Sequence, residues 1–310
     1  LSWYLANTFN QTFDPQISVS SGYTTIYLQT GYVRNTGLEL SLGYGHTWNN
    51  NFRWDSNFTL SHNKNKIKEL VRDYVHPETG ELINKDRLDV GGLGKARFIL
   101  KEGGTLGDLY TQSDLKRDDN GMVDIDPTGI VAIENNLPDI KLGSVFPKAN
   151  LAWSNHFSWK GISLSALFTA RIGGIVYSAT EAAMDQYGVS ERSALARDNG
   201  GVLVNNRTLV DAQNYYTTIG SESGLPQYYT YNATNVRLQE ASIGYLIPRK
   251  WLGNVCDIQV SVIGRNLWMI YNKAPFDPES VATTDNYYQG IDYFMLPSTR
   301  NIGFNVKINF

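Results

Sequence analysis

The chain has 310 residues, of which 42% are hydrophobic and 18% are charged, and its formal net charge is -3. This charge argues against a nucleic-acid-binding protein, which usually carries a basic stripe. No apolar run approaches the roughly 20 residues that a membrane-spanning helix needs, which excludes a helical membrane protein. The single cysteine, Cys256, cannot form a disulfide bond within the chain and is interpreted as a packing residue.

The amino-terminal segment gives no sign of a natural start. Residues 1–9 contain no basic segment, no apolar core and no initiating methionine, so no signal peptide is visible. We therefore expect the chain to begin within a longer protein, inside a strand.

Three pairs of segments alternate apolar and polar side chains, with short turns between the members of each pair. Such alternation predicts antiparallel hairpins with one apolar and one polar face. Asn266 interrupts the apolar face of the third pair, which predicts either a β-bulge or a position above the hydrocarbon for this residue. The expected pairs are residues 36–48 with 52–63, two strands within 148–173, and 234–247 with 256–271.

The last ten residues alternate without a break. Ile302, Phe304, Val306, Ile308 and Phe310 share one face, and the opposite face carries amides and a lysine. A strand of a water-soluble sandwich would show the same pattern. The aromatic carboxyl terminus and the repeated segments of about ten residues favour a transmembrane barrel. Phe310 is thus the predicted barrel-assembly terminus.

The lengths of the connections also alternate. Short turns join the members of each hairpin, whereas residues 67–146, 174–232 and 272–296 form long connections. This asymmetry is typical of outer-membrane barrels, whose long loops face the exterior. The direction of the chain allows zero or an even number of crossings within residues 67–146, which we place mostly outside the membrane, with an extra hairpin left open.

Five stretches carry a further pattern, and they occur in a fixed order along the chain. They are residues 32–40, 54–67, 102–107, 235–248, and 264–271 followed by Asp277-Pro-Glu279. Together they resemble the carboxy-terminal half of the SusC/RagA group of TonB-dependent outer-membrane transporters of Bacteroidetes. The resemblance covers essentially the whole chain.

The resemblance implies an all-β fold, in which residues 1–310 are the carboxy-terminal part of an antiparallel transmembrane β-barrel of about 22 strands with long extracellular loops. It implies a non-enzymatic protein of the bacterial outer membrane that imports oligosaccharides, other glycans or peptides, energised through TonB. A SusD-like surface lipoprotein would be its partner. A plug, a TonB-binding segment and a signal peptide would precede Leu1, so the TonB complex would be contacted through that missing part.

Aromatic residues of the two longest carboxy-terminal loops are the candidates for contact with substrate or with the lipoprotein. Flat rings with hydroxyl groups suit stacking on sugars or packing on a peptide, and the alternative is that they pack loop against loop. The candidates are Tyr215, Tyr216, Tyr228, Tyr229, Tyr231, Tyr287, Tyr288, Tyr293 and Phe294.

Three arginines of the predicted strands, Arg171, Arg237 and Arg265, are expected to face the lumen. An arginine that faces lipid at mid-bilayer costs roughly 2 to 4 kcal/mol. They either line the transport path or bridge to neighbouring strands, and we favour the second interpretation.

An acidic stretch contains Asp118, Asn120, Asp124 and Asp126, whose oxygens suit calcium. The twelve-residue EF-hand spacing with its closing glutamate is absent, so a solvated acidic turn is the preferred interpretation and a loop calcium site the alternative. No other metal or cofactor is expected.

Two other classes of protein stay open. One is a secreted β-sandwich carbohydrate-binding module, in which the apolar strand faces pack against a second sheet. The other is an outer-membrane barrel hydrolase that uses His156 with a serine and an acid or amide. The four histidines show no metal-binding spacing, and Glu222 stands at the centre of residues 220–224 where a nucleophile elbow needs serine.

Overall fold

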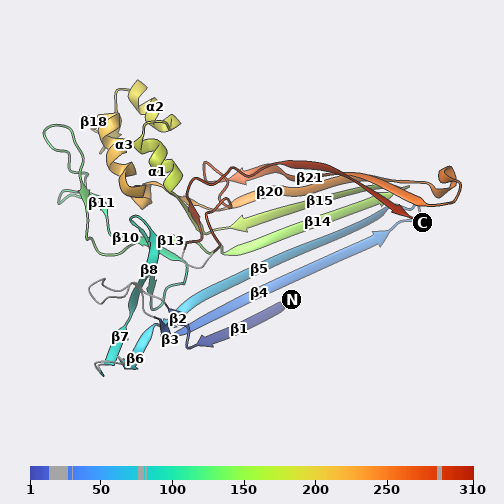
Figure 1. Ribbon diagram of the computed structural model, residues 1–310, viewed down its shortest axis with the longest axis horizontal. Helices are drawn as coiled ribbons and strands as arrows, with labels where there is room; N and C mark the ends of the chain where they lie inside the picture. Colours follow the sequence, from blue (N-terminus) through green and yellow to red (C-terminus); the bar gives the residue numbers. More distant parts are fainter. Residues whose placement is uncertain (14–26, 30, 76–79, 81, 285–287) are drawn as a thin grey trace.

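The computed structural model describes residues 1–13, 27–29, 31–75, 80, 82–284 and 288–310. In this part, eight long strands form one antiparallel sheet, called the wall below (Figure 1). In spatial order they are β1 (Ser2–Phe9), β4 (Tyr32–Thr47), β5 (Arg53–Glu69), β14 (Ala149–Trp159), β15 (Ile162–Ile172), β20 (Asn235–Ile247), β21 (Asp257–Asn272) and β23 (Asn301–Asn309).

The three expected hairpins are all present in the wall. β4 pairs with β5, β14 with β15, and β20 with β21. The tightest turn is Lys160–Gly161, where φ is 46° and 86°, the left-handed backbone that matches the twist of a two-residue hairpin. The third hairpin turns through the short 3-10 helix η4 (Arg249–Leu252).

Alternation along the strands gives the wall two chemically different faces. Exposed aliphatic and aromatic side chains make up the apolar face, and in the described residues no second sheet covers it. A sandwich module would bury these side chains, and the described residues do not show the second sheet that this alternative requires. The apolar face includes Leu42, Phe58, Trp153, Phe168, Ile243, Val262 and Phe304, and the polar face includes Glu39, Ser41, Thr59, Asn150, Ser165, Ser242, Ser261 and Asn305.

The predicted bulge lies between β20 and β21. The register shifts between Leu238 and Glu240, and Asn266 on the partner strand has a φ of 51°. β20 also shifts against β15 at the same place. The extra residue changes the parity of β20, so that Ala241 and Ile243 continue the apolar face.

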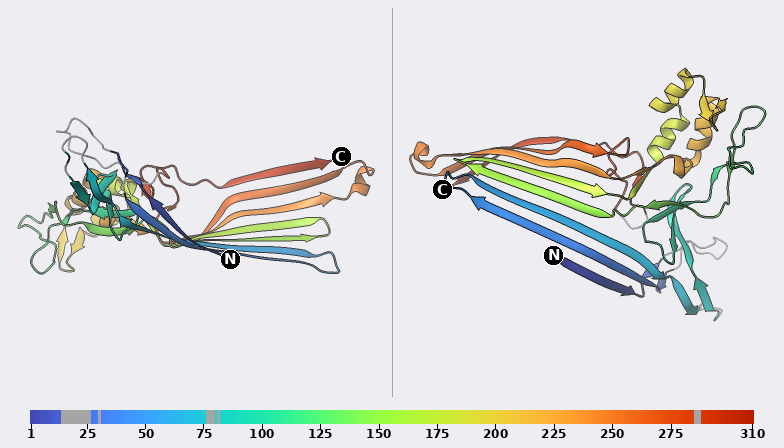
Figure 2. Two further views of the ribbon diagram at one scale, coloured as in Figure 1. Left: turned by 90° about the horizontal axis from the view of Figure 1, so that it is seen from below. Right: turned by 180° about the vertical axis from the view of Figure 1, so that it is seen from behind.

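The rest of the described chain gathers at one end of the wall, and both views of Figure 2 place the short hairpin turns at the opposite end. We call residues 70–148, 173–234 and 273–300 the loop region. None of its described strands joins the wall, so the described part of residues 70–146 makes zero crossings, which is one of the possibilities that the sequence left open.

The strands of the loop region form small separate sheets. They are β13 (Ile140–Ser144), β10 (Asp108–Thr111), β9 (Ala96–Lys101) and β8 (Arg87–Leu93) in one sheet; β19 (Thr230–Asn232), β16 (Ile175–Ser178) and β22 (Ile291–Asp292) in a second; and the pairs β6 (Val71–Val75) with β7 (Leu82–Lys85), β11 (Asp114–Leu115) with β12 (Ile133–Glu134), and β17 (Val202–Val204) with β18 (Thr208–Val210). Another pair, β2 (Thr12–Phe13) with β3 (Leu28–Gln29), lies between β1 and β4 in the sequence.

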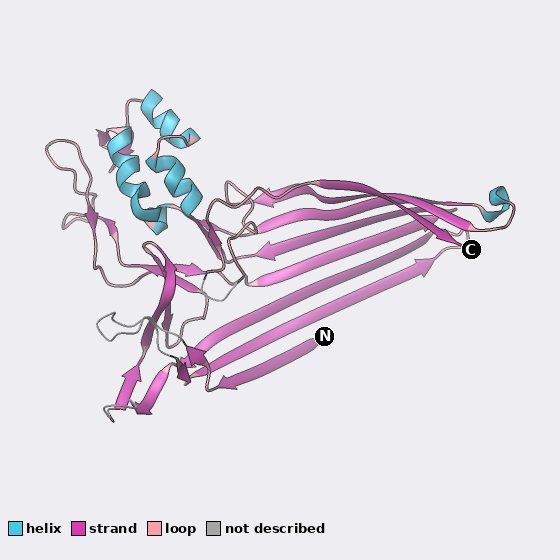
Figure 3. Ribbon diagram, viewed as in Figure 1, coloured by secondary structure: helices cyan, strands magenta, loops and turns pink. Residues whose placement is uncertain are grey.

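Helices occur in the loop region, although strand alternation gave no indication of them (Figure 3). They are α1 (Ala179–Gln186), α2 (Glu191–Asp198) and α3 (Ala212–Gly220), followed by the 3-10 turns η2 (Ser221–Ser223) and η3 (Pro226–Tyr228). Ser178, Ser190 and Asp211 cap the three α-helices by accepting a hydrogen bond from a backbone amide of the first turn. None of the helices in the described residues has both the length and the apolar character needed to cross a membrane.

The main hydrophobic core of the described chain lies in the loop region and not in the wall. Val33 and Ile67, at the ends of β4 and β5, anchor this core to the wall. Fully or almost fully buried side chains from distant parts of the sequence meet in it. They include Phe98, Leu109, Val131, Tyr177, Ile219, Leu225 and Ile291.

Candidate functional site

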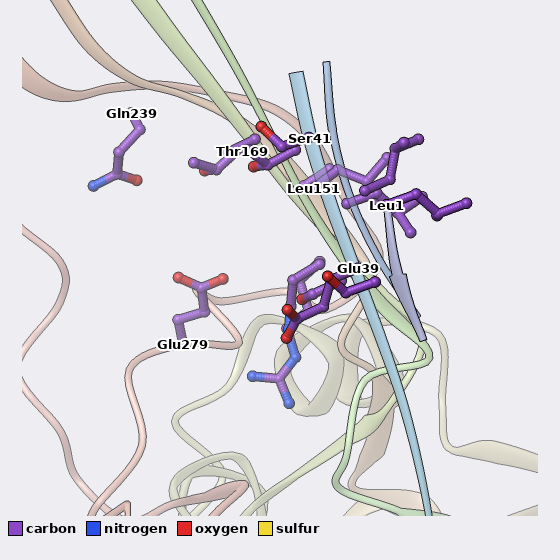
Figure 4. A pocket seen from close by; sticks show the side chains of 16 residues that line it. Leu1, Glu39, Ser41, Leu151, Thr169, Gln239 and Glu279 are labelled. Atoms are coloured by element: carbon purple, nitrogen blue, oxygen red, sulfur yellow. The ribbon is translucent and has the colours of Figure 1, made fainter. Parts of the chain in front are cut away.

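A cavity of about 680 Å³ lies on the polar face of the wall. β4, β5, β14 and β15 supply most of its lining, so the alternating polar residues of four neighbouring strands meet there. Gln239 of the bulge and Glu279 of the segment after β21 complete it (Figure 4). Polar lining residues are Ser2, Glu39, Ser41, Thr59, Ser61, Asn150, Thr169, Arg171, Gln239 and Glu279.

Charge in this cavity is mixed. Glu39 stands on β4, whereas Glu279 belongs to a different segment of the chain (Figure 4). Arg171, on β15, brings a guanidinium group to the same cavity. Its Nη2 donates a hydrogen bond to the carbonyl oxygen of Val145 at 2.7 Å, which ties the wall to the loop region. The cavity therefore offers both carboxylate and guanidinium groups.

Arg237 is nearly buried on the polar face, and it anchors the segment that follows β21. Its Nη2 and Nη1 donate to the two carboxylate oxygens of Asp277 at 2.8 and 3.1 Å. Glu279 lies 3.4 Å away, and Asn235 Oδ1 accepts two further hydrogen bonds from the guanidinium. Burial by itself would raise the pKa of Asp277, but hydrogen bonds, chiefly from Arg237, lower it. We call this arrangement the Arg237 anchor.

Arg265 lies on the next strand in a very different setting. Its Nε donates to Glu240 Oε2 at 2.8 Å across the β20–β21 pair, and both side chains are exposed to solvent. All three arginines thus have partners outside their own strand. Arg265 bridges to the neighbouring strand β20, Arg237 is bound to the segment that follows β21, and Arg171 combines a hydrogen bond to the loop region with a place in the cavity lining.

A second hollow of about 560 Å³ lies farther along the polar face, nearer the hairpin turns. Asp55, His156 and Ser165 line it and stand opposite one another in register on β5, β14 and β15. Asp55 is held by Arg53 at 2.6 and 2.7 Å. Within the described residues, no hydrogen bond joins His156 to either neighbour, so the row is not an assembled catalytic triad.

Several aromatic candidates pack inside the loop region. Tyr229 is fully buried and donates its hydroxyl hydrogen bond to Asp185 Oδ2 at 2.9 Å, so it offers no surface to a substrate or a lipoprotein. Tyr215, Tyr216 and Tyr228 are partly buried against the same core. Loop-on-loop packing therefore accounts for Tyr229 and for much of the other three rings.

The remaining aromatic candidates are more accessible. Tyr231 packs edge-on against Phe276, with ring centroids 5.8 Å apart. Tyr288, Tyr293 and Phe294 are exposed. Tyr287 lies outside the described residues.

Residues of the acidic stretch hold turns in place. Asp118 Oδ1 accepts backbone amides of Asn120 and Met122, and Asp126 Oδ1 accepts those of Thr128 and Ile130. These bonds lower the pKa of Asp126. Asp124 pairs with Lys116 at 2.7 Å. In the described residues, no group of three His, Cys, Asp or Glu side chains is arranged to hold a metal ion.

A buried polar network organises the helices, and nothing in the sequence singled it out. Asp185 of α1 is fully buried and accepts hydrogen bonds from Ser190, Tyr229 and Arg192, whose Nε lies 2.9 Å from Oδ1. The Arg192 guanidinium also stacks 4.8 Å above the Tyr229 ring. The available signal was the spacing of Ser178 and Glu181, a capping box at the start of α1.

The whole chain aligns with known receptors. TonB-dependent receptor P3 of Formosa agariphila is 25% identical over 98% of this chain, and TonB-dependent receptor P26 of the same organism is 24% identical over 100% of it. The predicted resemblance to TonB-dependent receptors is confirmed. Each alignment covers 32% of the relative, so the chain spans about a third of the length of these receptors. No protein-family model matches the chain.

Solved structures agree on the fold. The RagAB peptide importer in its closed-closed state matches 99% of this chain and 33% of the compared chain, with a TM-score of 0.67 and 19% identity. The open-open state of the same importer gives a TM-score of 0.66 with 18% identity. The wall and the loop region thus follow the fold of a section of that importer.

Proposed function

We propose that this chain forms a section of the wall of a TonB-dependent outer-membrane β-barrel that imports peptides or oligosaccharides, together with a SusD-like lipoprotein. The observation that carries the proposal is the eight-stranded sheet with one exposed apolar face and one polar face. Lipid contact on one side and an aqueous lumen on the other account for this division. Similarity to TonB-dependent receptors along the whole chain supports the same function.

In this proposal the wall is incomplete by itself. β1 pairs with β4 and β23 pairs with β21, so each strand leaves its other edge unpaired within the described residues. A β-barrel closes so that no edge remains in the hydrocarbon region. The further strands of a barrel of about 22 would pair with these two edges, and a plug would fill the lumen.

Peptides are the first class of substrate to test. Glu39 and Glu279 in the larger cavity can bind the ammonium groups of a peptide, and Arg171 can bind a carboxylate. The solved importer that shares this fold is described as a peptide importer. Oligosaccharides are the alternative class, and the exposed rings of Tyr288, Tyr293 and Phe294 are the candidates for stacking on them or for contact with the lipoprotein.

In this proposal, transport requires the closed and open states of the receptor to bind the ligand with different affinities. It requires no covalent bond to be made or broken. The Arg237 anchor holds the segment after β21 against the polar face, where its Glu279 reaches the cavity. Movement of this segment would change the charge presented to a ligand. His156 lacks a hydrogen-bonded acid and serine within the described residues, so we propose no hydrolytic step.

The test uses the full-length receptor purified in detergent with its membrane partners. We expect a lipoprotein to copurify, and mass spectrometry of the complex to identify bound peptides or glycans. Loss of the gene should abolish uptake of the identified ligand, and the full-length gene should restore it. Covalent conversion of the ligand by the purified receptor would refute the proposal, as would unchanged uptake in the deletion strain.

Within that experiment, Glu39→Gln with Glu279→Gln tests the cavity. Loss of two carboxylates should weaken binding of cationic peptides and leave neutral ligands unaffected. Glu191→Gln, on the exposed first turn of α2, is the control, and it removes one carboxylate from outside the cavity lining. Equal effects of the two sets of changes would exclude the cavity as the peptide site.

A further inference from the structure

A basic cluster lies at the loop end of β4 and β5, and it consists of Arg34, Lys64 and Lys66. Arg34 stands directly opposite Lys66 in the antiparallel register, and Thr36 stands opposite Lys64. Cβ atoms of directly opposed residues lie about 4.5 to 5.5 Å apart, and residues two apart in one strand are about 7 Å apart. The three cationic groups can therefore reach a common ligand.

The basic cluster belongs to the apolar face of the wall. Leu38, Leu40 and Leu42 follow Arg34 with the same parity on β4, and Leu60 and Phe58 precede Lys64 on β5. Residues of the opposite parity, Asn35 and Asn65, instead bond to each other on the side of the loop region. The cluster thus lies on the same side of the wall as the apolar face, between the apolar residues and the loop end of β4 and β5.

Among the described residues, no carboxylate pairs with a basic group of the cluster. Lys64 and Lys66 are exposed and form no ion pair with any described residue. The guanidinium of Arg34 donates hydrogen bonds to the neutral Asn7 Oδ1 and Tyr32 hydroxyl. The next carboxylate along β5, that of Glu69, lies 3.8 Å from Arg72. Within the described part of the chain, a negatively charged ligand would therefore meet basic groups that no carboxylate neutralises.

The position of the cluster identifies the kind of ligand. Lys64 lies four residues beyond Leu60, or about 13 Å along the strand, and long lysine side chains extend away from apolar surface toward polar surroundings. β1 adds Trp3 opposite Leu38 and Leu5 opposite Thr36, so apolar and aromatic surface reaches up to the cluster. In a membrane this is the depth of the lipid head groups.

We propose that Arg34, Lys64 and Lys66 bind the phosphate group of an outer-leaflet lipid, whose acyl chains lie along the neighbouring apolar face. Charge complementarity favours a phosphate over a neutral head group, and apolar surface directly below the cluster favours a lipid over a soluble phosphate. The inference rests on the proposed placement of the wall in an outer membrane.

The test uses full-length protein in nanodiscs of phosphatidylcholine, titrated with phosphorylated lipid A and followed by native mass spectrometry. The variant Lys64→Gln/Lys66→Gln should lower affinity for the lipid roughly 30-fold, because each basic residue near a membrane surface contributes about a factor of five. Both lysines are exposed and unpaired, so the fold should not change. Arg34 is left in place because it bonds to two neighbours.

Lys160→Gln/Lys250→Gln is the matched control, since it removes the same charge from exposed positions at the hairpin-turn end of the wall. It should bind phosphorylated lipid A within twofold of the wild type. Dephosphorylated lipid A should bind the wild type and the Lys64→Gln/Lys66→Gln variant equally.

Three outcomes would overturn the inference. They are equal affinity of the wild type and Lys64→Gln/Lys66→Gln, equal losses in both double variants, and binding of inorganic phosphate to the wild type as tight as that of the lipid. Cell fractionation separates this inference from the proposed function. Absence of the wild type from the outer membrane refutes the placement itself, whereas normal placement with unchanged lipid binding refutes the lipid site alone.

Discussion

Two arginines on the polar face show how strongly the surroundings of an ion pair determine its contribution to stability. The side chain of Arg237 is 5% exposed and that of its partner Asp277 is 11% exposed, whereas Arg265 is 67% exposed. Removing one member of a buried pair leaves an uncompensated charge, and an exposed pair is weakened by solvent. The sequence separation of 40 residues between Arg237 and Asp277 also makes this pair a connection between wall and loop region.

We expect Arg237→Met to cost about 3 to 5 kcal/mol of local stability, because it leaves the Asp277 carboxylate buried without its partner. Hydrogen exchange measured by mass spectrometry should show faster exchange in residues 273–284. Arg265→Met is the control, with an expected cost of about 0.2 to 1 kcal/mol. Similar exchange in the two variants would contradict a special role for the Arg237 anchor.

Two polar side chains on the apolar face, Asn155 and Ser56, accept hydrogen bonds from tryptophan. Trp54 Nε1 donates to Asn155 Oδ1 at 3.1 Å, and Trp153 Nε1 donates to Ser56 Oγ at 3.0 Å. In lipid, an unpaired amide has no water to bind. Each indole therefore provides the hydrogen bond that its neighbour would otherwise lack.

Trp54→Phe should destabilise the folded barrel by about 1 to 3 kcal/mol, because Asn155 loses its donor. The double variant Trp54→Phe/Asn155→Leu should recover most of this loss, since it removes the unsatisfied group as well. Urea unfolding in lipid vesicles, followed by tryptophan fluorescence, measures both. Trp159→Phe is the control, because its indole nitrogen makes no hydrogen bond with a described residue. Additive effects of the two changes would contradict the pairing.

At the scale of elements, the Asp139 carboxylate links groups on or next to β8, β9, β10 and β13. Asp139, just before β13, accepts hydrogen bonds from Arg87 Nε at 2.7 Å and from Gln112 Nε2 at 3.0 Å, and Lys101 Nζ lies at 2.8 Å. These groups, Arg87 first among them, hold the pKa of Asp139 well below its usual range. The carboxylate thus joins strands that are far apart in the sequence.

The stability of this small sheet should fall in acid. Because the pKa of Asp139 is lower in the folded state than in the unfolded state, its contribution is complete above about pH 5 and decreases as pH falls below about 4 toward the folded value. Pulsed hydrogen exchange of β8 and β9 at each pH measures this. In the Asp139→Asn variant, the amides of β8 and β9 should be less protected from exchange at pH 7. Their protection should also lack the decrease in acid that protonation of Asp139 causes in the wild type. An unchanged pH profile in the variant would assign the effect to other carboxylates.

The sequence predicts the wall better than it predicts the loop region, for a physical reason. Contact with lipid on one face and water on the other imposes strict alternation, as in Phe304 and Val306 against Asn305 and Lys307, and the strands follow from it. Helix α1 has eight residues and no comparable pattern, so its capping box was the main local signal. Short helices are specified by tertiary packing more than by their own sequence.

In the candidate site, the sequence likewise predicts some features and not others. Arginines on the polar face follow from parity and from the cost of charge in lipid, and the structure places Arg171 in the cavity lining, joins Arg237 to the segment after β21 and joins Arg265 to β20. Their partners could not be predicted, because they depend on how a long connection folds back. An aromatic residue in a loop is equally compatible with burial and exposure, and Tyr229 and Phe294 represent the two cases.

At the scale of the whole molecule, the carboxyl terminus has no packing role in the described structure. The Phe310 side chain is 92% exposed and follows β23 at the edge of the wall. We propose that this ring acts in assembly into the membrane.

We expect Phe310→Ala to lower the amount of receptor in the outer membrane several-fold, while the thermal stability of the assembled fraction stays unchanged. Quantitative immunoblotting of membrane fractions and heat-dependent gel mobility measure the two quantities. Leu296→Ala is a matched control, because Leu296 is also highly exposed and lies outside the strands. Equal membrane levels of the two variants would contradict an assembly role for the terminal ring.

The shared core of the loop region limits how such a receptor can be re-engineered. Phe98 and Val131 come from one connection and Tyr177 and Ile291 from two others, yet all four pack into one core, and the parallel pair of β16 and β22 joins the last two connections directly. A chimera that takes a single loop from a relative would contain cavities and unpaired backbone groups, because the other loops that packed against the original loop would no longer fit. Exchange of ligand specificity between relatives therefore requires transplanting the complete set of loops on the wall as one unit.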